Sequence, residues 1–148
     1  MRAFIILFSV VTVLITPKVA SVKTIQIEFT ENDSYSIEVA NIDAGDTIEW
    51  LPTNGGHNVE FLAGPEMTLL PPKSKIDQVY SVVLKVPGVY LYGCTPHANM
   101  GMLGLIIVDN NFHNIEKIKT IELPPVALSV LARLIRSCTG HVNEVRYN

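Results

Sequence analysis

One loop near the middle of the chain concentrates side chains that bind soft metal ions. It reads GCTPHANMGM and carries Cys94, His97, Met100 and Met102 within ten residues. A second histidine, His57, follows the turn 53–56. Two imidazoles, a thiolate and a weak axial thioether form the trigonal donor set of a blue-copper centre. If the two loops meet, the sequence predicts one copper ion bound by His57, Cys94, His97 and Met102.

Other kinds of protein could use the same residue types. A cysteine hydrolase would take Cys94 as nucleophile with His57 or His97 as base, and a structural zinc site would bind the same three side chains. The sequence predicts no helix start at Cys94 that would lower the thiol pKa, and Met102 is a poor zinc ligand. Copper is therefore favoured, while the hydrolase, the zinc site and a purely structural sandwich remain alternatives.

Short strands must position the two loops. Apolar and polar residues alternate with a period of two, which predicts strands over 24–29, 35–39, 47–51, 79–86, 89–92 and 103–108. Turn residues separate these runs and no helical pattern intervenes, which is typical of an all-β antiparallel sandwich or barrel. The strands 89–92 and 103–108 would anchor the loop between them, and Pro96 would stiffen it.

A helical pattern follows the last predicted strand. Apolar residues recur every three or four positions between Pro124 and Ser137, which predicts an amphipathic helix, and a shorter helix is predicted over 114–121. We therefore expect a β-sandwich over 22–110, helices packed on it over 111–138, and a polar tail over 139–148.

The first residues read as an export signal. An uncharged apolar run over 3–16 is too short to span a bilayer comfortably, so residues 1–21 are predicted to be a signal peptide and the protein to be periplasmic. Removing Arg2 and Lys18 takes the formal net charge from −3 to −5. Such a surface disfavours binding to nucleic acid or stable association with an anionic membrane. Cys94 and Cys138 do not suggest a disulfide framework.

Five stretches of the sequence resemble the pseudoazurins, which are type I copper proteins of the cupredoxin fold. They are residues 44–47, 56–60, 73–76, 87–90, and 94–97 with 100–102. The resemblance implies a Greek-key sandwich or barrel with a short C-terminal helical extension, and the ligands His57, Cys94, His97 and Met102. It also implies that Asn58 ties the two ligand loops together and donates its backbone N–H to the thiolate. Thr95 and Pro96 would lie around the ligands without binding the ion.

The same resemblance implies a function. Pseudoazurins are one-electron carriers and not enzymes, and their partners would be copper nitrite reductase, nitrous oxide reductase or a c-type cytochrome. Electrons would pass through the edge of His97, in a docking patch formed by Pro96, Met100, Lys73 and Lys75. The familiar lysines just before the first histidine and before the cysteine are replaced here by Gly55 or Gly56 and Gly93. We therefore expect weaker electrostatic docking than in a lysine-ringed relative.

Overall fold

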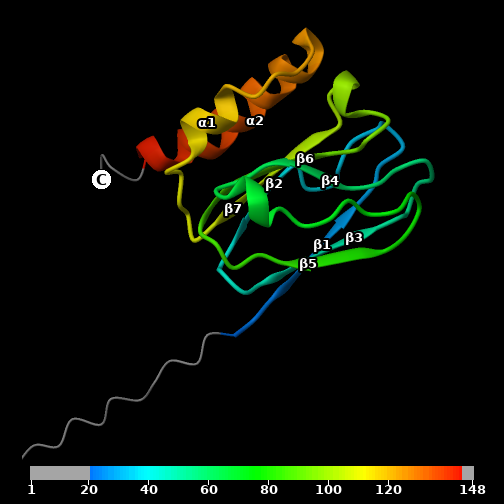
Figure 1. Cartoon of the computed structure of the whole chain (residues 1–148), viewed down its shortest axis with the longest axis horizontal. Coiled ribbons are helices and arrows are strands. Elements are labelled where there is room, and N and C mark those ends of the chain that lie inside the picture. The colour runs from blue at the N-terminus through cyan, green and yellow to red at the C-terminus, as the bar shows by residue number, and fades with distance from the viewer. Residues whose placement is uncertain (1–20, 145–148) are drawn as a thin grey trace, which may run out of the picture.

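The computed structural model describes residues 21–144, which form a two-layer β-sandwich with two helices on one outer face (Figure 1). One sheet has the order β1-β3-β5 and comprises β1 (Thr24–Glu28), β3 (Thr47–Leu51) and β5 (Tyr80–Val83). The other has the order β2-β7-β6-β4 and comprises β2 (Val39–Ile42), β4 (Glu60–Ala63), β6 (Gly88–Gly93) and β7 (Leu103–Val108). The all-β prediction is confirmed as an open sandwich rather than a closed barrel.

Two strand pairs correct the expectation of a wholly antiparallel arrangement. β1 pairs with β3 in parallel, and β2 pairs with β7 in parallel. In the first case the chain crosses to the other sheet to form β2 before it returns, so β3 enters its sheet in the same direction as β1. Parallel neighbours need such a crossover, whereas a tight hairpin joins antiparallel ones.

The strand predicted over 35–39 is also wrong. Tyr35 makes a single bridge to Phe29, and the ladder begins only at β2. The Ser36 hydroxyl accepts a hydrogen bond from the backbone N–H of Glu28, and such side-chain bonding competes with regular pairing. Strand β4 was not predicted, because its four residues, EFLA, do not alternate apolar with polar side chains, although burial alternates along the strand.

The strands that flank the metal-binding loop are buried on both faces. Every residue of β6 and β7 is buried, which explains the nearly continuous apolar run LGLIIV. One set of alternate side chains, including Tyr92 and Ile106, joins the core between the sheets. The other set, including Leu91 and Leu105, joins a second core beneath the helices. Fixed on both sides, these strands give the loop rigid ends.

Both predicted helices are present on the outer face of this sheet. Helix α1 (Ile115–Lys119) lies against β6, and α2 (Pro125–Glu144) lies against β7. Helix α2 continues beyond Ser137 into the segment expected to be a tail, since helical bonding propagates where no proline interrupts it. Neither helix of this region has the length and apolar composition that a bilayer span requires. The predicted signal peptide lies outside the described residues, apart from residue 21.

Candidate metal centre

His57 is held by the turn that follows β3. Gly56 adopts a φ of +87°, a left-handed conformation that glycine accepts readily. The Asp77 carboxylate accepts hydrogen bonds from the backbone N–H groups of Gly56 at 2.6 Å and His57 at 3.3 Å. The His57 ring is buried beside Phe29, with the ring centroids 5.6 Å apart. The turn therefore fixes the direction in which the imidazole points.

The loop between β6 and β7 closes on itself through backbone hydrogen bonds. The Cys94 N–H donates to the Met102 carbonyl at 3.2 Å, and the Met102 N–H donates to the His97 carbonyl at 3.2 Å. The short 3-10 helix η2 (Ala98–Met100) ends at Gly101, whose φ is +104°. A Cβ added to Gly101 would lie 2.8 Å from the Val130 side chain, so α2 packs directly against this loop.

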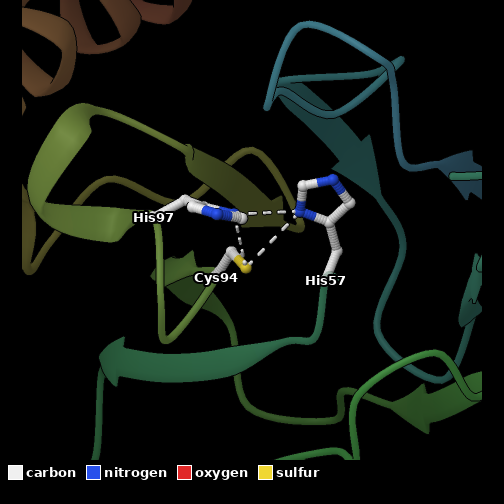
Figure 2. Close-up of side chains that lie close together, drawn as sticks. All are labelled: His57, Cys94 and His97. Atoms are coloured by element: carbon white, nitrogen blue, oxygen red, sulfur yellow. Dashed lines mark hydrogen bonds between the residues drawn. The ribbon is translucent and has the colours of Figure 1, made fainter. Parts of the chain in front are cut away.

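Side chains from the two loops converge on one point (Figure 2). The Nδ1 atoms of His57 and His97 lie 3.1 Å apart, and the Cys94 sulfur lies 3.7 Å from the first and 3.5 Å from the second. These distances leave one position about 2.0 Å from all three atoms. Zinc–nitrogen bonds in proteins, for comparison, are about 2.0–2.1 Å and zinc–sulfur bonds about 2.3 Å. The triangle therefore has the size of a single-ion site.

Met102, the fourth donor predicted from the sequence, lies in the same buried cluster as Cys94. Met102 is 1% exposed, and its backbone makes hydrogen bonds with the backbones of both Cys94 and His97. The metal-binding atoms of His57, Cys94 and His97 all lie within 4.8 Å of one another, as a single-ion site requires. The donors also fit copper chemically, because sulfur ligands favour Cu(I) while imidazole suits Cu(II).

Burial and nearby N–H groups have opposite effects on the pKa of the Cys94 thiol. Burial raises the pKa of Cys94, while the backbone N–H groups of Asn58 and His97 lower it. Burial also lowers the pKa of His57, and the neighbouring His97 adds to this effect. Without a metal, the site therefore favours a neutral thiol beside a neutral imidazole, and a metal ion must displace the thiol proton.

Asn58 joins the two ligand loops through its side chain. Its amide oxygen accepts a hydrogen bond from the Thr95 N–H at 2.8 Å, and its amide nitrogen donates to the Thr95 hydroxyl at 2.9 Å. The Thr95 hydroxyl donates in turn to the Glu60 carboxylate at 2.7 Å. Val59 N–H donates to the buried Ser74 hydroxyl at 2.8 Å. These contacts hold the histidine turn in register with the cysteine loop.

A comparison of the sequence with models of protein families shows which family the chain belongs to. The sequence profile of copper binding proteins of the plastocyanin/azurin family matches residues 24–109, which is more than half of the chain. The chain belongs to this family. Its site therefore belongs to a copper-binding class, and the structure is that of a cupredoxin with a C-terminal helical extension.

The individual proteins that resemble the chain include pseudoazurins and a plastocyanin. The chain is 38% identical over 90 residues to pseudoazurin from Paracoccus pantotrophus, covering 57% of this chain and 59% of that protein. It is 35% identical over 108 residues to plastocyanin from Prochlorothrix hollandica, covering 66% and 82%. The solved structure of pseudoazurin from Methylobacterium extorquens AM1 matches with a TM-score of 0.70 at 26% identity, covering 77% and 98%. The chain spans a little over half the length of the curated pseudoazurins it matches.

The predicted docking residues of this cupredoxin lie at the surface near the site. The His97 side chain is 22% exposed, and Pro96 is exposed next to it. Met100 is 61% exposed. Lys73 and Lys75 are exposed on a neighbouring segment, and Lys73 lies 3.9 Å from Glu60. The patch therefore combines the apolar surface of Pro96 and Met100 with charges of both signs beside it.

Two carboxylates near the metal centre were missed at the sequence level. Asp77 anchors the His57 turn, and Asp33 lies 3.6 Å from His57 Nε2 and 3.8 Å from His97 Nδ1. Asp33 and Asp77 both have positive φ values, +49° and +58°. Aspartate tolerates this conformation better than most residues, so a turn was the only signal that the sequence offered.

The remaining soft side chains lie elsewhere in the cupredoxin. Cys138 is a free, buried thiol on α2 that donates to the Ile135 carbonyl at 3.2 Å. Met67 lies in the exposed 3-10 helix η1 (Met67–Leu69). Met102, rather than either of these residues, shares a buried cluster with Cys94.

Proposed function

We propose that this cupredoxin is a one-electron carrier that binds a single copper ion through His57 Nδ1, Cys94 Sγ, His97 Nδ1 and the Met102 thioether. The observation that carries the proposal is the triangle of donor atoms, which has room for one ion at bonding distance. Copper bound there would supply one-electron chemistry between Cu(II) and Cu(I).

The protein's contribution is rigidity around the donors. Buried strands hold both ends of the cysteine loop, and Asn58 bonds that loop to the histidine turn. Donors that barely move when the charge of the site changes allow fast electron transfer. The N–H groups of Asn58 and His97 stabilise negative charge on the Cys94 sulfur and so tune the site.

Electrons would enter and leave through the exposed edge of His97. The neighbouring Pro96 and Met100 offer an apolar surface for a short-lived complex, and Lys73 and Lys75 would steer the partner weakly. Short-lived complexes of this kind need only a small interface. By likeness to pseudoazurins we expect the partners to be copper nitrite reductase, nitrous oxide reductase or a c-type cytochrome.

We further infer that the working protein is periplasmic and begins near residue 22, after removal of the signal peptide. The sandwich over 22–110 and the helices from 111 onward would then form one unit, because they share the second apolar core. The mass of the protein isolated from the periplasm of a Gram-negative host tests the cleavage. A mass that retains residues 1–21 would contradict it.

The copper proposal is tested by an absorption spectrum after addition of Cu(II) to the purified protein. We expect a strong visible band from sulfur-to-copper charge transfer. The band should be lost in Cys94→Ser and kept in Cys138→Ser, a matched control that removes the other buried thiol. A wild-type protein without the band, or one that binds zinc but not copper, would overturn the proposal.

The environment of Cys94 argues against the alternative function of a cysteine hydrolase. A nucleophilic cysteine needs a lowered pKa, whereas burial raises the pKa of Cys94. Cys94 also directly follows strand β6 rather than starting a helix. Alkylation by iodoacetamide should accordingly be slow at Cys94 near neutral pH.

A further inference from the structure

The turn over residues 30–34 places a carboxylate beside both imidazoles of the metal centre. Asp33 Oδ1 lies 3.6 Å from His57 Nε2 and 3.8 Å from His97 Nδ1. The His57 side chain is only 4% exposed, while that of Asp33 is 53% exposed. The carboxylate therefore lies at the boundary between solvent and the site.

Several contacts fix the position of this turn. The Thr30 N–H donates to the Ser34 carbonyl at 2.9 Å, and the two hydroxyls of these residues lie 2.6 Å apart. At the ends of the turn, the Phe29 ring packs on His57 and the Tyr35 hydroxyl donates to the Asn58 carbonyl at 3.3 Å. Both ends of the turn are thus attached to the segment that carries His57.

The charge of Asp33 acts on the metal-binding atoms themselves. Asp33 raises the pKa of both His57 and Cys94, alongside the larger effects of burial. Asp77 acts in the same direction, but its Oδ1 already accepts two backbone hydrogen bonds, which disperse its charge. The Asp33 carboxylate instead makes its close contacts with the two imidazoles.

We propose that Asp33 sets the reduction potential of the site, because its carboxylate stabilises the doubly charged state of a bound copper ion over the singly charged state. This inference rests on the proposed copper-binding function. Attraction grows with the charge of the ion, so a nearby anion favours Cu(II) and lowers the potential. Asp33 is a positioning and tuning residue and need not bind the ion.

The test compares Asp33→Asn with the wild type in a redox titration at neutral pH. Asparagine keeps the shape and tolerates the positive φ, but removes the charge. At the solution potential where wild-type copper is half reduced, we expect Cu(I) to exceed Cu(II) by roughly three- to tenfold in the variant, allowing for solvent screening. A ratio that stays within roughly 1.5-fold of the wild type, too small for a charge this close, would overturn the proposal.

Asp43→Asn is the matched control for net charge. Asp43 lies in the turn before β3, whereas His57 lies in the turn after it, and the five-residue strand between them spans roughly 17 Å. That separation exceeds the Debye length of about 8 Å at physiological salt, so the control should leave the ratio unchanged. An equal shift in both variants would mean that Asp33 has no particular role.

A second variant separates the charge from the hydrogen-bonding capacity of Asp33. Asp33→Gly removes both without straining the backbone, and it should shift the ratio at least as far as Asp33→Asn. NMR of the diamagnetic Cu(I) protein should then show faster solvent exchange of the His57 Nε2–H in Asp33→Gly than in the wild type. A shift in the glycine variant alone would exclude the charge as the cause. If the wild type lacks the visible band, the proposed function fails instead.

Discussion

Asn58 does more for the site than its position beside a ligand suggests. Its side chain exchanges two hydrogen bonds with Thr95, and its backbone N–H stabilises negative charge on the Cys94 sulfur. The two loops that supply the metal ligands are far apart in the sequence. The side chain of Asn58 joins the histidine turn to the cysteine loop by hydrogen bonds. At the scale of single residues, the geometry of the centre depends on this contact.

Replacing Asn58 with alanine should destabilise the fold by roughly 1–3 kcal/mol, because it leaves the Thr95 N–H without its partner. Urea unfolding of the metal-free protein measures the change. Asn99→Ala is the matched control, since Asn99 is exposed and lies in the cysteine loop that carries Thr95. We expect the control to lose less than about 0.5 kcal/mol. Equal losses in both variants would contradict the linking role of Asn58.

The candidate ligands could be predicted from the sequence because their chemistry is rare and their spacing is short. Cys94, His97 and Met102 lie within nine residues, and His57 follows a recognisable glycine turn. Asp33 could not be predicted in the same way, because an aspartate in a polar turn has no distinguishing pattern. Only the three-dimensional position of the turn places its carboxylate beside the imidazoles.

Among the elements, helix α2 supports the cysteine loop from outside. Its Val130 side chain occupies the space beside Gly101 that a Cβ would need, and Ala98 of the loop packs into the same core as Leu131. The loop is therefore clamped between the sandwich and the helix. This contact links the C-terminal extension to the geometry of the metal centre.

A double-mutant cycle tests this contact. Gly101→Ala should destabilise the protein by roughly 1–3 kcal/mol, through both its φ of +104° and the clash with Val130. In a Val130→Ala background the clash disappears, and the loss should shrink by about 0.5–1 kcal/mol. Thermal or urea unfolding of the four proteins gives the coupling. Strict additivity would mean that the helix does not press on the loop.

The junction between β1 and β3 depends on a buried carboxylate. Asp46 accepts hydrogen bonds from the backbone N–H groups of Lys23 at 2.8 Å and Asp43 at 3.0 Å. The pKa of Asp46 is lowered in the folded protein, most strongly by the Lys23 N–H; burial opposes this, and the Asp43 N–H and the charge of Lys23 add to the lowering. Ionised Asp46 therefore stabilises the fold above its unfolded pKa of about 3.9, and this contribution is lost as the pH falls through the lower folded value.

Asp46→Asn should accordingly be less stable than the wild type by a constant amount between about pH 5 and pH 7. The difference should shrink below about pH 4, as the wild-type carboxylate becomes protonated. Unfolding curves across this pH range measure both effects. Asp43→Asn, which removes only an exposed carboxylate 3.7 Å from Lys23, should show little difference at any pH.

Element types were easier to predict than element pairing. The apolar runs of β6 and β7 and the helical repeat of α2 lie in the sequence itself. The parallel pairing of β1 with β3 depends on the chain crossing between sheets, which no local pattern records. For the same reason Tyr35 was assigned to a strand, although it closes the turn beside the metal centre.

At the scale of the whole molecule, the charge distribution predicts docking with a weak dependence on salt. The chain has 14 acidic against 11 basic residues, and Lys73 of the docking patch lies close to Glu60. A lysine at Gly93 would be crowded, because an added Cβ would lie 3.0 Å from Ala98, Leu103 and the Met102 carbonyl, and these neighbours would have to move. The packing of the cysteine loop thus disfavours a lysine at this position.

Stopped-flow measurements with copper nitrite reductase test this prediction. The association rate should change by less than about threefold between roughly 10 and 300 mM ionic strength. Gly55→Lys restores a lysine before the first histidine, where an added Cβ would keep an ordinary 3.8 Å contact with Asp77, and should steepen the dependence. A fall of tenfold or more in the wild type, about the size expected for strong electrostatic steering, would contradict the prediction.

The grouping of three candidate ligands in one loop has a consequence for the denatured chain. Cys94, His97 and Met102 lie within nine residues of one another in the sequence, so they stay close in space when the sandwich unfolds. His57 is distant in the sequence and does not. A denatured molecule should thus retain a weak, local affinity for Cu(I). Because ligand binding to the unfolded form offsets binding to the native form, copper should raise the melting temperature by less than the native affinity alone implies.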